Sequence, residues 1–217
     1  MSNKINPKWE EQILVSPRSQ VFENETLAFQ GVETDSYKVD KILDNISKDL
    51  HVMRRGATSD PTPKENNAEI NTDFKQPIPY VMIKRGKEIY VYERLSQGGE
   101  SRLHNKLSLG VGGHMNLEEG SFNDQLMINT TRELEEELDI DAERATMKYI
   151  GLINDDDDEV GRVHIGILAF LELSEDATVE VRETDQLRGF WSTVEELKKT
   201  EVYERLESWS KIAIDIQ

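Results

Sequence analysis

A helical segment near the middle of the chain most limits the fold that this sequence can adopt. In residues 121–138, four side chains recur every four residues and form one stripe along a helix: Leu126, Thr130, Leu134 and Leu138. Such a stripe faces a hydrophobic core, so the helix needs a partner to pack against. Strand-like segments stand on both sides of it in the sequence. We therefore predict a helix packed on a sheet.

The flanking segments alternate between strand and helix patterns. Residues 78–83 and 88–92 read as two strands of a hairpin, with a turn at 85–87. Further strands are predicted at 107–111, 149–153 and 163–173, with a short one ending at Phe190-Trp191, and helices at 193–199 and 202–214. This alternation is typical of the α/β or α+β class.

The first part of the chain is predicted to be an extension, residues 1–74, that packs on a domain formed by residues 75–217. A short strand at 13–15 precedes an amphipathic helix at 38–50, and residues 55–72 read as a polar linker. Whether the extension also caps a substrate pocket or forms a homodimer contact stays open at this stage.

Composition excludes several classes of protein. The 217 residues carry a formal net charge of −17, which repels nucleic acids and anionic membrane surfaces. The absence of cysteine excludes a disulfide scaffold, a thiolate zinc site and a cysteine nucleophile. No apolar run approaches the roughly 20 residues of a membrane span. We expect a cytoplasmic protein with a small-molecule partner.

Carboxylates gather on one face of the central helix. Glu133, Glu136 and Glu137 span an arc of roughly 100° around the helix axis. Like charges at this spacing repel each other, and a divalent cation such as Mg²⁺, which prefers oxygen ligands, reverses the sign of that interaction. Arg132 stands one turn before Glu136 and can pair with it. A solvated acidic face is the simpler interpretation of the glutamate run alone.

The surrounding pattern resembles the Nudix box, Gly-x5-Glu-x7-Arg-Glu-U-x-Glu-Glu-x-Gly-U, where U is apolar. The box positions are matched by Arg132, Glu133, Leu134, Glu136, Glu137 and Ile140, and Gly112-Gly113 match its opening glycines. The hairpin before the box and the Phe190-Trp191 strand after it also resemble this family. The resemblance covers roughly residues 76–215 and is closest to a MutT-like subgroup whose box opens with Gly-Gly-His.

Two positions depart from the box. About five extra residues separate the glycines from Arg132, so either Asp124 or Glu119 fills the first acidic position. Asp139 replaces the late glycine, and aspartate tolerates unusual backbone conformations better than most residues.

The resemblance implies a Nudix-type α/β/α sandwich with a mixed β-sheet, and a Mg²⁺- or Mn²⁺-dependent hydrolase of a nucleotide-type diphosphate. The implied metal ligands are Glu133, Glu136 and Glu137, with Arg132 orienting a carboxylate and Glu136 the first candidate for ligand or base. Substrate-binding candidates are Gly112, Gly113, His114 and Arg94, and the loop before Trp191 offers Glu183 and Asp185 as a base or extra ligand.

Other interpretations concern individual features. The acidic run at 154–159 lacks the spacing of an EF-hand loop and reads as a solvated turn. His164 falls in a strand pattern and is predicted to be a packed or edge histidine. A diphosphate isomerase with this fold relies on a cysteine that the chain lacks. A catalytically silent, nucleotide-sensing Nudix module remains the alternative function.

Overall fold

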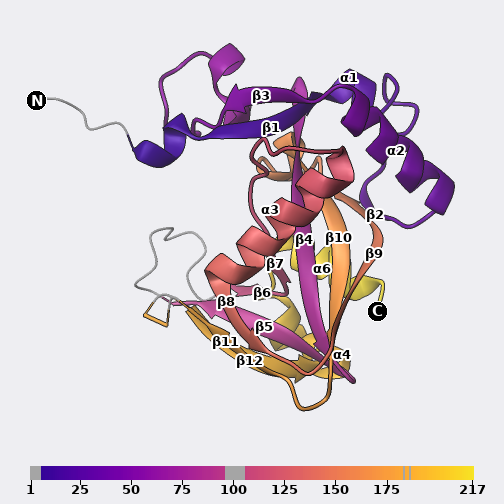
Figure 1. Cartoon of the computed structure of the whole chain (residues 1–217), viewed down its shortest axis with the longest axis vertical. Coiled ribbons are helices and arrows are strands. Elements are labelled where there is room, and N and C mark those ends of the chain that lie inside the picture. The colour runs from indigo at the N-terminus through magenta and orange to yellow at the C-terminus, as the bar shows by residue number, and fades with distance from the viewer. Residues whose placement is uncertain (1–5, 96–105, 183, 186) are drawn as a thin grey trace, which may run out of the picture.

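A mixed β-sheet forms the centre of the computed structural model, which describes residues 6–95, 106–182, 184–185 and 187–217. Six strands follow the order β12-β5-β4-β10-β9-β2 across it, and four shorter strands pair at its margins. The pair β10–β4 is parallel, whereas the other pairs are antiparallel. Helix α3 crosses one face and α6 lies behind the sheet (Figure 1). This arrangement confirms the predicted α/β/α sandwich with a mixed sheet.

The strands have the following bounds: β1 Gln12–Pro17, β2 Gly31–Glu33, β3 His51–Arg54, β4 Phe74–Arg85, β5 Glu88–Arg94, β6 Leu107–Ser108, β7 Gly110–Val111, β8 Leu138–Asp141, β9 Ala145–Asn154, β10 His164–Leu173, β11 Thr178–Val181 and β12 Leu187–Thr193. The α-helices are α1 Arg18–Val21, α2 Ser36–Lys48, α3 Phe122–Glu137, α4 Val194–Leu197, α5 Thr200–Tyr203 and α6 Ser208–Asp215. Short 3-10 helices are η1 Pro7–Glu10, η2 Lys64–Asn66, η3 Ala68–Ile70 and η5 Gly161–Val163.

Strand alternation divides the core between the two faces of the sheet. On β4, Val81 and Ile83 pack in the cluster that contains Leu134 of α3. Their neighbours Tyr80 and Met82 point the other way, into the cluster that receives the apolar residues of α6. Because successive side chains of a strand point to opposite faces, one apolar strand supplies both layers.

The N-terminal segment adds a third cluster above α3. Its residues Leu14, Phe22 and Ile42 are buried together with Phe122 and Leu126 from the first turns of α3. Strand β1 pairs with β3 along its length and with the start of β4 at its end. Helix α2 begins after Asp35, whose side chain accepts a hydrogen bond from the Lys38 backbone N–H at 2.9 Å. Residues 6–74 therefore pack directly on the sheet and on α3.

Two sequence-based predictions need correction. Residues 202–214 are not one helix, because the backbone around Leu206 leaves the helical path to form a bridge with Leu107. The Glu207 N–H donates to Leu107 O at 3.0 Å, and α6 begins only after it. The stretch 55–72 contains η2 and η3 and buries Asn67 and Ala68, so it is packed against the rest of the chain.

Across the described ranges, no helix combines the length and the apolar character needed to cross a membrane.

Candidate functional site

Two consecutive glycines bring the loop after β7 against strand β4 and the C-terminal half of α3. A Cβ atom at Gly112 would overlap the backbone carbonyl oxygen of Pro79, and one at Gly113 would overlap the Glu133 carboxylate. Gly112 therefore needs glycine for close approach, because the Pro79 carbonyl is backbone, whereas a Cβ at Gly113 would have to displace the end of the Glu133 side chain. As a result, the Glu133 carboxylate lies directly against the backbone of the loop.

Arg132 connects the box acids. Its Nη1 lies 2.8 Å from Glu133 Oε1 and 3.5 Å from Glu136 Oε1. The pairing with Glu136 was predicted from the one-turn spacing, but the shorter contact is with Glu133. Arg132 Nη2 also donates to the His114 carbonyl oxygen at 2.8 Å, which ties the guanidinium to the glycine loop.

The box carboxylates differ in exposure. The side chain of Glu133 is 13% exposed, whereas that of Glu136 is 60% exposed. Burial and the nearby charge of Glu136 raise the pKa of Glu133, and Arg132 opposes that shift. Glu137 is half-buried at the end of α3. Burial of the Arg94 guanidinium lowers its pKa, but nearby charges, among them that of Glu137, outweigh this effect and raise the pKa above its usual value.

Asn129, which sequence reasoning missed, fixes the loop to the helix. It is fully buried on α3. Its Oδ1 accepts from the Asn116 N–H at 2.8 Å and from Arg132 Nη2 at 3.1 Å. Its Nδ2 donates to Asn116 O at 3.0 Å and to Gln125 O at 2.8 Å. An asparagine on a helix gives no sequence signal for this role, because the pattern does not show which backbone it meets.

The remaining predicted residues differ in their surroundings. Arg94, at the end of β5, donates from Nε to Glu207 Oε1 at 2.9 Å, so an acidic partner already occupies it. Asp185 is exposed in the turn before β12. Glu183 lies outside the described residues. Asp124 forms a capping box with Ser121 at the start of α3, where its Oδ2 accepts from the Ser121 N–H at 2.8 Å.

A second group of side chains meets on the other side of the glycine loop. Glu69 from η3, His114 from the loop and His164 from the start of β10 place their ligand atoms within 4.8 Å of one another. Among the residues that the structure describes, this is the one group of three His or acidic side chains gathered so closely, and the three box glutamates are not. His164 is buried, as predicted. Two of the four histidines of the chain therefore lie side by side. No motif around Glu69 indicates that it joins them.

The charges in this group are set by burial and by the partners. Burial raises the pKa of Glu69, but the hydrogen bond from His114 and the neighbouring His164, His114 and Arg55 outweigh it and bring the pKa to about 2. Burial lowers the pKa of His164 to about 4, with His114 adding to the effect. Glu69 is therefore a carboxylate at neutral pH, and His164 is a neutral imidazole.

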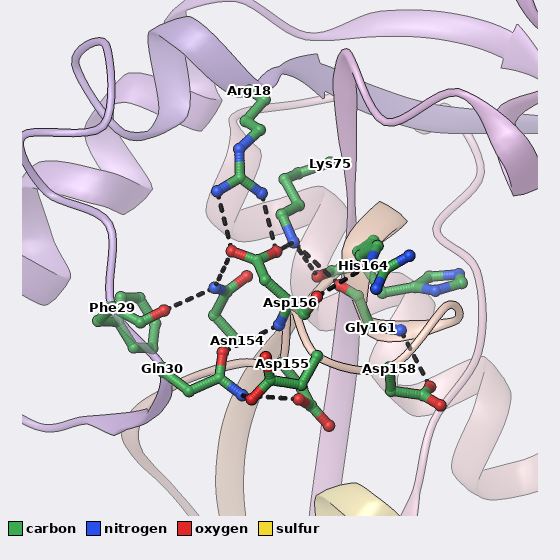
Figure 2. Close-up of polar contacts among 12 residues, drawn as sticks. Arg18, Phe29, Gln30, Lys75, Asn154, Asp155, Asp156, Asp158, Gly161 and His164 are labelled. Carbon is green, nitrogen blue, oxygen red and sulfur yellow. Dashed lines mark hydrogen bonds and ion pairs between the residues drawn. The ribbon is translucent and has the colours of Figure 1, made fainter.

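Only the first half of the acidic run before η5 differs from the predicted solvated turn: Asn154 and Asp155 are buried and Asp156 is half-buried in an ionic network, whereas residues 157–159 are exposed as predicted. Figure 2 shows Asp156 between Arg18 and Lys75. The Lys75 side chain is completely buried, and its Nζ lies 2.9 Å from Asp156 Oδ1. Both Arg18 Nη atoms lie 2.8 Å from the same carboxylate. The composition of the run could not reveal that two cations from distant segments neutralise it.

Lys75 also supports the start of β10. Its Nζ donates to Gly161 O at 2.9 Å and to His164 O at 3.2 Å (Figure 2). Burial lowers the pKa of Lys75 to about 8, although Asp156 opposes the shift. Burial raises the pKa of Asp156, but hydrogen bonds from Arg18 and Lys75 outweigh it, so the net pKa falls well below its usual value. The network therefore holds the segment that carries His164.

The donor set of the box fits a hard divalent cation. Glu133, Glu136 and Glu137 offer only carboxylate oxygens, which are the ligands that Mg²⁺ and Mn²⁺ accept in proteins. They come from the last turns of one helix. The most exposed of them, Glu136, has space to turn its carboxylate toward that of Glu133.

This fold is that of the Nudix hydrolases. The structure is similar to the crystal structure of Tm1382, described as "a putative Nudix hydrolase", with a TM-score of 0.72, 26% identity and coverage of 95% of this chain and 97% of that chain. A MutT Nudix hydrolase from Burkholderia pseudomallei matches with a TM-score of 0.44 and 19% identity, over 65% of this chain and 96% of that one. The superfamily assignment rests on the Tm1382 structure.

A sequence relative gives a closer grouping. The chain is 52% identical over 212 residues to Protein YmaB of Bacillus subtilis (strain 168), which covers 96% of this chain and 98% of that protein. The chain therefore belongs to the same family as YmaB. No family model matches the chain.

Proposed function

We propose that this chain is a divalent-metal-dependent hydrolase that cleaves a phosphoanhydride bond in a nucleoside-diphosphate-linked or related substrate. The observation that carries the proposal is the packing of the Glu133 carboxylate against Gly113, with Glu136 and Glu137 within one turn on the same helix. Bound Mg²⁺ or Mn²⁺ supplies charge stabilisation for the leaving phosphate and a lower pKa for attacking water. The similarity to Tm1382 supports this reaction class.

The residues have distinct proposed roles. Glu133, Glu136 and Glu137 hold the cation, and Glu136 is the first candidate for the base because its carboxylate is the more accessible. Arg132 orients Glu133 through the 2.8 Å contact and neutralises part of the local negative charge. In a chain of net charge −17, cations at the site offset the repulsion of an anionic substrate.

Substrate contacts are proposed at the rim of the same region. The proposed substrate-binding residues are Gly112, Gly113 and His114 in the loop after β7, and Arg94 at the end of β5. Asp185, in the exposed turn before β12, is an alternative base or extra ligand, as is Glu183. We also assign the chain to the MutT-like subgroup whose box opens with Gly-Gly-His.

A turnover screen tests the proposal. Full-length protein is incubated with Mg²⁺ and sugar nucleotides, dinucleoside polyphosphates, ADP-ribose, NADH or nucleoside triphosphates, and phosphate-containing products are measured. The double variant Glu136→Gln, Glu137→Gln should lose Mg²⁺-stimulated turnover, since both oxygen ligands lose their charge. Glu135→Gln is the matched control, because Glu135 is exposed on the same helix and lies outside the box positions.

Two results would contradict the proposal. Unchanged turnover in the double variant would remove the box carboxylates from the reaction. Tight nucleotide binding without any product over hours in Mg²⁺ would instead identify a silent sensing module. Sedimentation of the same samples tests the proposed homodimer, which should appear at twice the mass of the 25.0 kDa chain.

A further inference from the structure

Three side chains other than the box glutamates have the arrangement of a metal site. The Nε2 atom of His114 lies 3.3 Å from Glu69 Oε1 and 3.4 Å from His164 Nε2. The three residues come from η3, from the loop after β7 and from the first residue of β10, which are far apart in the sequence. Only the fold brings them together, and the box chemistry does not use Glu69 or His164.

The spacing of these atoms matches the coordination geometry of zinc. Zinc binds histidine nitrogens and carboxylate oxygens at about 2.0–2.2 Å in a tetrahedral arrangement, which sets ligand atoms roughly 3.3 Å apart. The two separations from His114 Nε2, 3.3 Å to Glu69 Oε1 and 3.4 Å to His164 Nε2, agree with that edge length. The third separation, between Glu69 and His164, is at most 4.8 Å, so a single ion lies within reach of all three atoms after small side-chain adjustments.

Neighbouring groups orient the ligand atoms for this purpose. His164 Nδ1 lies 2.6 Å from the carbonyl oxygen of Val160. A carbonyl only accepts, so Nδ1 carries the proton and Nε2 keeps its lone pair facing His114. Arg55 Nε donates to Glu69 Oε1 at 3.1 Å and fixes that carboxylate. Such second contacts to a carbonyl and to a ligating carboxylate are typical of metal sites.

We propose that Glu69, His114 and His164 form a second cation site that binds a divalent transition metal ion of the Zn²⁺ type. Imidazole nitrogens select such ions over Mg²⁺, so this site differs in ligand chemistry from the all-carboxylate box. Three protein ligands leave a fourth position for water. Solvent reaches that side of the site, since the side chains of Glu69 and His114 are 17% and 13% exposed.

The second site shares His114 with the proposed substrate contacts, whereas Glu69 and His164 have no proposed role in the hydrolase activity. His114 follows Gly113, and its carbonyl oxygen accepts from Arg132. A bound ion therefore fixes the glycine loop through the residue next to Gly113. It also fastens the N-terminal segment, through Glu69, to the sheet.

Cobalt spectroscopy tests the proposal on the full-length protein. After treatment with a chelator and dialysis, the protein is titrated with Co²⁺, whose visible absorption distinguishes tetrahedral nitrogen and oxygen ligation from octahedral oxygen ligation. We expect one equivalent with a tetrahedral spectrum, displaced by Zn²⁺ but not by Mg²⁺. Glu69→Gln and His114→Ala should each weaken Co²⁺ binding by about 10-fold or more, because even the loss of a second contact costs that much.

The control is Glu136→Gln, which removes a box carboxylate and should keep the tetrahedral spectrum. Far-UV circular dichroism of the metal-free variants checks folding. If a variant does not fold, the wild-type spectrum alone still shows whether the protein binds Co²⁺ in a tetrahedral site. A purely octahedral spectrum in wild type, or a tetrahedral one that is lost in Glu136→Gln and kept in Glu69→Gln, would overturn the second site and leave a hydrogen-bonded His114 in its place.

Discussion

Replacing the members of the buried Lys75–Asp156 pair one at a time should give unequal losses of stability. In Asp156→Asn, the completely buried Lys75 loses the negative charge that lies 2.9 Å from its Nζ. Breaking a buried pair in this way costs about 3–5 kcal/mol, because a charge stays in the interior without compensation. For a chain of this size, each kcal/mol lowers Tm by roughly 2–4 °C, so Tm should decrease by about 10 °C.

Lys75→Met should cost less, about 1–3 kcal/mol. The Asp156 carboxylate keeps both contacts to Arg18 at 2.8 Å, and its side chain is 32% exposed. The main loss is at the carbonyl oxygens of Gly161 and His164, which lose a donor at roughly 1 kcal/mol each. Removing a buried cation offsets part of that cost.

Urea unfolding followed by circular dichroism measures both variants and the double variant. The double variant should be no less stable than Asp156→Asn alone, since Lys75 is then no longer an uncompensated cation. The coupling free energy should be at least about 1 kcal/mol. If Lys75→Met were the more costly single change, or if the two losses simply added, the assignment of Arg18 as the second partner of Asp156 would be wrong.

Other outcomes follow from the same contacts. The lowered pKa of Asp156 means that its contribution to stability is complete above the unfolded value of about 4 and decreases below it, so wild type should lose more urea stability between pH 7 and pH 3 than Asp156→Asn does. Gly112→Ala should destabilise the protein by about 1–3 kcal/mol in urea unfolding, because its Cβ meets the rigid carbonyl of Pro79. Gly113→Ala should cost less than about 1 kcal/mol but lower kcat/KM, because it meets the movable carboxylate of Glu133; wild-type kcat/KM would contradict the proposed role of that carboxylate.

The parts of the fold that could be predicted are those set by local periodicity. The alternation of Tyr80, Val81, Met82 and Ile83 reveals a strand buried on both faces, because side chains alternate at every residue. The four-residue stripe through Leu134 likewise reveals a helix on a core. The break near Leu206 could not be predicted, because it depends on a backbone bridge to a distant segment.

The candidate site also contains residues that local periodicity predicts and residues that only the fold brings together. The box acids stand within one turn of each other, so helix geometry alone places Glu133 and Glu136 on one face. Their roles in metal binding stay predictions. Glu69 and His164 come from separate segments, and no local sequence pattern predicts that both contact His114. The solvated interpretation of the acidic run holds for residues 157–159 but missed Asp156, because composition does not show that Lys75 and Arg18 approach it.

The parallel pairing of β4 with β10 has a consequence for how the chain reaches its fold. During synthesis the N-terminal segment emerges first, with Leu14 and Phe22 apolar and in need of partners. Those partners include Ile165 and Ile167 on β10, which leave the ribosome much later. Such long-range contacts slow folding, because loop-closure entropy is lost before they form. The N-terminal cluster can therefore be completed only after β10 has been made, so the late strand closes a core that begins with the first residues of the chain.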